Sequence, residues 1–143
     1  MRIAQRVLII VTAAVLVVFG ISKTYREREE RFREQWEKTQ TELFMQRVTA
    51  NRCLSEEEYL HYMSSLNYKG TFLQIKAEEY QKEQDGKGNV YYYLVSWEEI
   101  QDCLCKDGNY IFEDNSVIRI EITYRGREGS VRNSYYGIAS GKE

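Results

Sequence analysis

A segment of fifteen residues without a charge, Val7 to Ile21, lies near the start of this 143-residue chain. Arg2 and Arg6 precede it, and a strongly charged run follows it from Ser22 onward. A short basic head, an apolar core and a polar follower together form the pattern of a membrane-insertion signal. What the chain can fold into therefore depends first on whether this segment stays in a membrane.

The apolar segment has two interpretations. A secretory signal has an apolar core of ~7–15 residues and small residues at its cleavage site; here the best cut follows Gly20, with Val18 at the −3 position. A spanning helix needs ~17–25 mostly apolar residues, which the segment reaches with its flanks. We favour a retained anchor over residues 1–25, with residues 7–21 in contact with membrane lipid.

The basic residues around the anchor give conflicting indications of its orientation. Five follow it within fifteen residues, against two before it, which favours a cytoplasmic carboxyl side under the positive-inside rule. A very short tail with two arginines is instead typical of a signal-anchor whose tail stays inside. We expect a single pass through the cell membrane, with the rest of the chain extracytoplasmic. The five basic residues are Lys23, Arg26, Arg28, Arg31 and Arg33.

Residues 26–50 are predicted to continue the helix as an amphipathic stalk. Opposite charges recur four residues apart, as in Arg26 with Glu30, which supports an isolated helix. The chain has no proline to interrupt it. An apolar stripe runs along the stalk and needs a partner, either the chain's own domain or neighbouring helices in an assembly. The residues predicted to make this contact are Phe32, Trp36, Leu43 and Val48.

Residues 51–138 are predicted to form an α+β head, with a frayed tail at 139–143. Capping boxes at Ser55 and Ser96 begin two short helices, the first ending near 67–70 with Gly70 as its terminator. Alternating apolar residues and a turn at Asp85–Gly88 indicate an antiparallel sheet of about four to five strands. The expected strands are 71–83, 90–95, 110–112, 117–124 and 131–138.

No residue pattern predicts catalysis, a cofactor or a metal site. The only histidine, His61, falls on a helix without a nucleophile signature. The acidic pairs at 56–58 and 98–99 belong to the capping boxes, and the pair at 78–79 has no cleft partner in the sequence. A net charge of −2 gives no basic face for nucleic acid.

Tyrosines and cysteines leave alternatives open. Tyr91–Tyr93 would either stack on a ligand or pack against the core and cross-strand neighbours, and packing is the commoner use. Cys53 would form a disulfide with Cys103 or Cys105 in an oxidising space, or all three would stay reduced.

Four parts of the chain carry a family resemblance. They are the anchor Val7–Ile21, the segment Phe44–Thr49, the capping box Leu54–Tyr59 with Leu66 and Gly70, and the strand Phe72–Ile75. Together they resemble small type IV pilin-like or pseudopilin-like membrane proteins of tight-adherence or type II secretion-like systems in clostridia and their relatives. The cleavage signature of a pre-pilin is missing, so the resemblance implies a membrane-retained accessory subunit with pilin-like or other membrane partners. The alternative function is a membrane-tethered, extracytoplasmic module that binds a peptide or a glycan.

Overall fold

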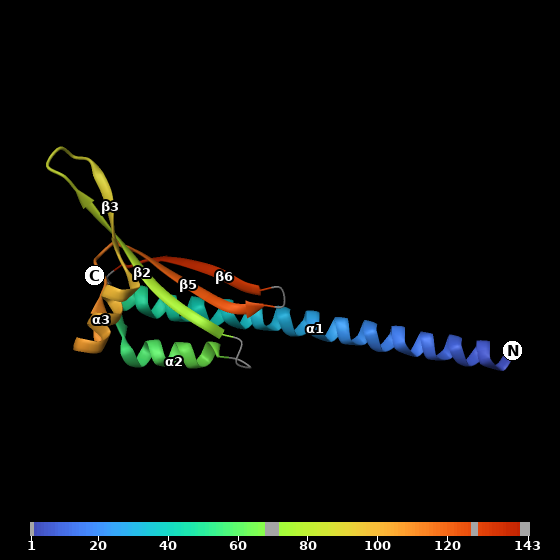
Figure 1. Ribbon diagram of the computed structural model, residues 1–143. Helices are drawn as coiled ribbons and strands as arrows, with labels where there is room; N and C mark the ends of the chain where they lie inside the picture. Colours follow the sequence, from blue (N-terminus) through green and yellow to red (C-terminus); the bar gives the residue numbers. More distant parts are fainter. Residues whose placement is uncertain (1, 68–71, 127–128, 141–143) are drawn as a thin grey trace. The chain divides into compact units, whose positions relative to one another are not determined.

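The computed structural model describes residues 2–67, 72–126 and 129–140, and it has the α+β arrangement predicted from the sequence. In these residues a long apolar N-terminal helix is followed by two short helices and by strands in two antiparallel sheets (Figure 1). The elements are α1 (Arg2–Asn51), β1 (Cys53–Ser55), α2 (Glu56–Leu66), β2 (Phe72–Gln84), β3 (Val90–Val95), α3 (Trp97–Asp107), β4 (Asn109–Ile111), β5 (Val117–Gly126) and β6 (Gly129–Ile138).

The chain divides into two compact units within α1, and the division does not fall where the sequence predicts it. The anchor unit is Met1–Trp36 and the head unit is Glu37–Glu143. The predicted stalk, residues 26–50, is therefore shared between the units instead of forming a separate segment. Its last turns belong to the head, because their inner face is buried there.

The anchor unit is one helical segment with apolar side chains on its surface. Large apolar residues from Ile3 to Ile21 are more than half exposed. Thr12 and Thr24 donate their hydroxyls to the carbonyls of Leu8 and Gly20, at 2.8 and 2.9 Å. These bonds satisfy the hydroxyls within the helix itself.

The larger sheet has the strand order β3-β2-β5-β6, and each neighbouring pair is antiparallel. Strand β5 shows the predicted alternation: Ile118, Ile120, Ile122 and Tyr124 are all buried. The predicted hairpin of β2 and β3 is confirmed, with Gln84 opposite Val90. Strand β6 lies at one edge, also as predicted, and β3 lies at the other.

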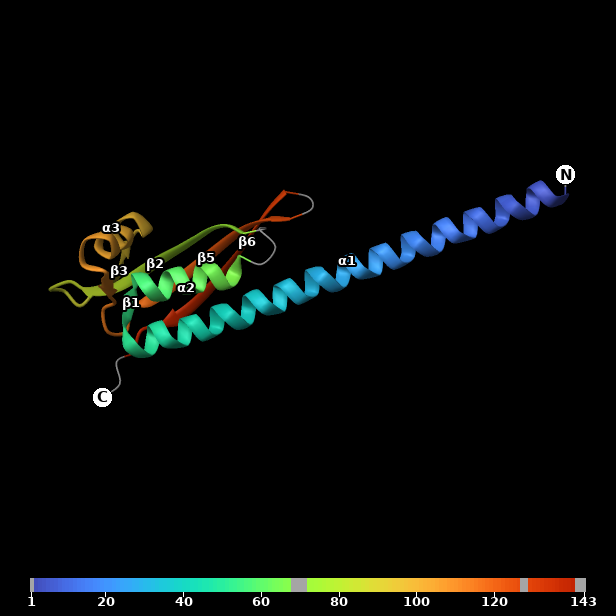
Figure 2. The same ribbon diagram turned by 90° about the horizontal axis from the view of Figure 1, so that it is seen from below.

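The head's core lies between one face of this sheet and the inner faces of α1 and α2. Figure 2 shows the last turns of α1 and the whole of α2 running along the sheet. The rings of Phe44 and Tyr62 stack with centroids 4.1 Å apart, which joins the two helices. Met45 lies directly against Gly137 of β6, where a side chain would have no room. The buried core residues of α1 and α2 are Phe44, Met45, Val48, Tyr62 and Leu66.

The predicted helix caps are present. Ser55 Oγ accepts a hydrogen bond from Glu58 N at 3.1 Å, and Ser96 Oγ accepts one from Glu99 N at 3.4 Å. Gly108 ends α3 in the left-handed conformation, with φ +76°. Helix α2 ends at Leu66 with Asn67 as its C-cap, one residue before the predicted range of 67–70, while Gly70 lies outside the described residues.

A second sheet, which the sequence did not predict, joins β1 to β4. Arg52 enters β1 with a positive φ of 50°, and its carbonyl accepts from Phe112 N at 2.7 Å. This sheet fixes the connection between α1 and α2 beside the start of β5.

The predicted fraying of residues 139–143 is wrong at its first position. Ala139 is completely buried, and its carbonyl accepts from Asn115 N at 2.7 Å. Its own N–H donates to Ser116 O at 2.9 Å. The paired backbone therefore continues one residue beyond β6; residues 141–143 lie outside the described part.

Candidate interaction surfaces

The predicted stripe on α1 is only partly exposed. In the anchor unit, the rings of Phe32 and Trp36 stack with centroids 6.5 Å apart and are 52% and 37% exposed. In the head unit, Leu43 is 47% exposed. Each of these three residues leaves apolar surface exposed on α1.

Val48 does not belong to that exposed surface, so its predicted contact with a partner is corrected. It is only 1% exposed and lies in the head's core. The reason is helical geometry: the five-residue step from Leu43 to Val48 turns the side chain by about 140° around the axis. Val48 instead shares the inner face of α1 with Phe44 and Met45.

Polar side chains on this inner face were not singled out from the sequence. Glu37 is buried and accepts from Asn133 Nδ2 of β6 at 3.1 and 3.2 Å. Thr41 Oγ1 and Tyr62 OH are hydrogen-bonded at 2.7 Å, and burial raises the pKa of the Tyr62 phenol. These bonds attach α1 to β6 and α2. They could not be predicted because the partners are 96 and 21 residues apart.

Glu79 of β2 is the most deeply buried carboxylate found among the described residues, with none of its surface exposed. Its Oε1 accepts from Gln81 Nε2 at 2.7 Å and from Tyr110 OH at 2.8 Å. Its Oε2 accepts from Glu113 N at 2.9 Å and from Ser116 Oγ at 2.8 Å. Burial, and then the bond to Glu79, raise the pKa of Tyr110. Both oxygens thus serve to hold β4 and the β4–β5 connection against β2.

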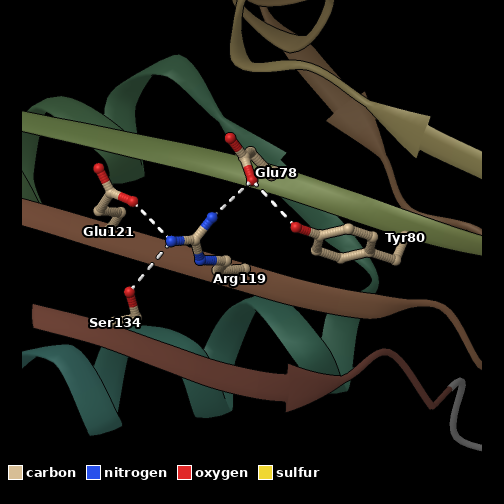
Figure 3. Close-up of polar contacts among 5 residues, drawn as sticks. All are labelled: Glu78, Tyr80, Arg119, Glu121 and Ser134. Atoms are coloured by element: carbon tan, nitrogen blue, oxygen red, sulfur yellow. Dashed lines mark hydrogen bonds and ion pairs between the residues drawn. The ribbon is translucent and has the colours of Figure 1, made fainter.

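Arg119 forms the centre of a polar network on the face of the sheet opposite the Ile118–Ile122 side chains (Figure 3). Its guanidinium donates to Glu78 Oε2 at 3.1 Å, Glu121 Oε2 at 2.6 Å and Ser134 Oγ at 3.3 Å. Tyr80 OH also donates to Glu78 Oε2, at 3.4 Å. Arg119 therefore links β5 to β2 through Glu78 and to β6 through Ser134.

The tyrosine run lies on the β2–β3 hairpin. All three tyrosines are about half exposed, as are Val90 and Leu94. The predicted packing of Tyr91–Tyr93 against the core is therefore wrong, while their cross-strand neighbours are Glu83, Lys82 and Gln81 of β2. The run of strand-forming residues predicts β3 itself, but it does not predict that β3 lies at the edge of the sheet.

The remaining candidates from the sequence are scattered. His61 is exposed on α2, and Glu98 and Glu99 are exposed in the first turn of α3. Cys53, Cys103 and Cys105 are free, and burial, followed by Glu58, raises the pKa of the Cys53 thiol. Within the described ranges, no three His, Cys, Asp or Glu residues are grouped so as to hold a metal ion.

The chain was compared with protein-family models, curated proteins and solved structures, and none of them matches.

Proposed function

We propose that this protein is a non-enzymatic, single-pass membrane protein that assembles with other membrane subunits through its N-terminal helix. The observation that carries the proposal is α1, which contains a span long and apolar enough to cross a membrane. None of that span is buried within the protein. A core helix of similar composition would be mostly buried, so the exposed span favours a lipid environment.

The assembly role is supported by the apolar surface that continues past the span. Phe32, Trp36 and Leu43 lie beyond the apolar segment on the same helix and keep about 37–52% of their surface exposed. Aromatic residues with partly exposed rings are enriched in protein interfaces. A pilin-like or secretion-apparatus accessory subunit is the more specific form of this proposal, and it rests on the family resemblance of the sequence.

The stripe is tested by placing charges on it. We expect Trp36→Glu combined with Leu43→Glu to lower co-purification of partner subunits from detergent-solubilised membranes at least about tenfold, because an unpaired carboxylate in an interface costs more than about 1.4 kcal/mol. Circular dichroism of the purified variant checks that the head remains folded.

The matched control for the stripe is Gln35→Glu combined with Gln46→Glu. Both glutamines are exposed on α1, so the control adds the same two charges with almost no change in side-chain shape. At ~100° per residue, Gln35 lies at least about 60° around the helix from Phe32, Trp36 and Leu43, and Gln46 lies at least about 40° from them. Equal recovery of partners with both double variants would contradict the assembly role.

Retention and orientation of the anchor are tested together. We expect the mature protein to keep its full mass of 17.0 kDa, since the anchor is not removed. We also expect proteinase K to digest the head on intact cells. Loss of the residues up to Gly20 would indicate a cleaved signal. Protection of the head until the cells are permeabilised would place it in the cytoplasm, as the basic residues behind the anchor alone predict.

A tethered, extracytoplasmic peptide- or glycan-binding module is the second candidate function, because Tyr91, Tyr92 and Tyr93 are all exposed on one hairpin. Exposed tyrosine rings suit contacts with sugars or peptides. Binding of a soluble oligosaccharide or peptide that is abolished by Tyr92→Ala, but not by Trp36→Glu, would favour this function over the assembly role.

A further inference from the structure

The edge strand β3 has the chemistry of a strand that pairs with another chain. Among the residues that the structure describes, β3 is hydrogen-bonded to β2 alone. Its sequence, Val90-Tyr-Tyr-Tyr-Leu-Val95, contains no charge, proline or glycine. Natural edge strands usually carry such residues to prevent pairing with other chains. Figure 1 shows the hairpin, with β3 in yellow, extending beyond the rest of the sheet.

The hairpin turn determines which backbone groups face the open edge. Asp85 N donates to Asn89 O at 2.9 Å, Gly88 N donates to Asp85 O at 3.1 Å, and Gly88 has a φ of +86°. This is a three-residue loop with a glycine bulge, closed by a hydrogen-bonded pair. Hydrogen-bonded and non-hydrogen-bonded pairs alternate from there. The N–H and C=O groups of the alternate residues Val90, Tyr92 and Leu94 therefore face away from β2.

We propose that β3 pairs antiparallel with β3 of a second copy of this chain, centred on Tyr92. In this register Tyr92 faces Tyr92 of the other copy, and Val90 faces Leu94. These are the three residues whose backbone groups face the open edge, so each facing pair exchanges two hydrogen bonds. The facing side chains are two tyrosines, or an aliphatic pair, and contacts of both kinds stabilise antiparallel strands.

Charge favours a second copy as the occupant. The paired segment, Asn89 to Ser96, has no charged residue, so self-pairing brings no like charges together. The same register carries Lys87 of the turn to the start of α3 in the other copy, where Glu98 and Glu99 are exposed. The acidic residue of the turn, Asp85, is occupied within it: its carboxylate accepts from Lys87 N, Asn89 N and Asn89 Nδ2.

The opposite edge of the sheet lacks this chemistry. Strand β6 carries Arg132 and two glycines, Gly129 and Gly137. An exposed charge and flexible glycines are the features that protect natural edges. Tyr136 of β6 is 64% exposed, close to the 62% of Tyr92, so the two tyrosines form a matched pair for an experiment.

The proposal is tested by disulfide cross-linking of the full-length chain in detergent, with Cys53, Cys103 and Cys105 replaced by serine. Opposite residues of a hydrogen-bonded pair have Cα atoms ~5.5 Å apart, which suits a disulfide. We expect Tyr92→Cys to give a covalent dimer under copper phenanthroline at least about five times faster than Tyr136→Cys. We expect Leu94→Cys to cross-link with Val90→Cys in a mixture but not with itself, because its self-partner lies about 13 Å along the strand.

A second variant keeps the test independent of side-chain chemistry. Val90→Pro removes an N–H that faces the open edge and leaves the pairing with β2 intact, so the head should remain folded while cross-linking of Tyr92→Cys is lost. Equal cross-linking at Tyr92 and Tyr136, or self-cross-linking of Leu94→Cys as fast as that of Tyr92→Cys, would overturn the proposed register. Absence of cross-linking by Tyr92→Cys would overturn self-pairing. The open edge of β3 would then be available to an extended peptide of another protein.

Discussion

Glu79→Ala is expected to lower the free energy of unfolding of the head by at least about 3 kcal/mol. The substitution removes an acceptor from four donors at once. Ser116 is almost fully buried, and the hydroxyl of Tyr110 lies beside it at the same carboxylate. A buried donor that loses its acceptor costs about 1–3 kcal/mol. Chemical denaturation followed by far-ultraviolet circular dichroism measures the effect.

The matched control for Glu79 is Glu83→Ala on the same strand. Glu83 lies four residues further along β2, on an exposed part of the hairpin. We expect its removal to change the free energy of unfolding by no more than about 0.5 kcal/mol. Glu79→Gln should fall between the two, since it keeps the volume and one acceptor oxygen while replacing the other oxygen with a donor. Equal effects of both alanine variants would show that the four hydrogen bonds contribute little.

Glu79 also illustrates how far the sequence could predict a site. The sequence showed Glu78 and Glu79 as an acidic pair on a strand. Because neighbouring residues on a strand point to opposite faces, one of the two carboxylates had to face the core side. The donors that satisfy it, Tyr110 and Ser116, lie 31 and 37 residues away, and no local pattern identifies them.

The parts of the fold that depend on neighbouring residues in the sequence, such as strand alternation and helix caps, were predictable. The alternation of Ile118, Ile120 and Ile122 predicted β5, and the serines at 55 and 96 predicted the starts of α2 and α3. By contrast, β1 was not predicted because its three residues are too few to show a period of two, whereas β4 was predicted one residue late, at 110–112. The pairing of these two strands depends on the chain reversing between them, which is a tertiary effect.

Val48 lies outside the exposed stripe on α1 because it follows Leu43 by five residues. Steps of seven and four residues keep a side chain within about 40° of one line, while a step of five does not. The inner face at this end of the helix is instead defined by Phe44, Met45 and Val48. No local pattern shows where the helix first meets the sheet, and the head begins at Glu37, earlier than the predicted residue 51.

Gly137 of β6 lies directly against side chains of α1, and we expect Gly137→Val to destabilise the head by about 3 kcal/mol. Even the Cβ atom of an alanine at this position would lie 2.7 Å from Met45 Sδ and 3.0 Å from Thr49 Cγ2. Overpacking of this kind costs about 1–3 kcal/mol, and the branched side chain of valine adds two more methyl groups. The side chains of Met45 and Thr49 would have to shift to make room for the valine.

A double-mutant cycle separates this steric effect from a general loss of stability. Met45→Ala removes the side chain that Gly137→Ala would meet, so we expect the double variant to be at least about 1 kcal/mol more stable than the sum of the two single effects predicts. Gly86→Ala serves as the control, because no atom lies within 4 Å of a Cβ at that glycine. Strict additivity of Met45→Ala and Gly137→Ala would mean that the helix and the sheet are not in contact there. In that case the last turns of α1 would be free to act as part of the stalk, as the sequence alone suggested.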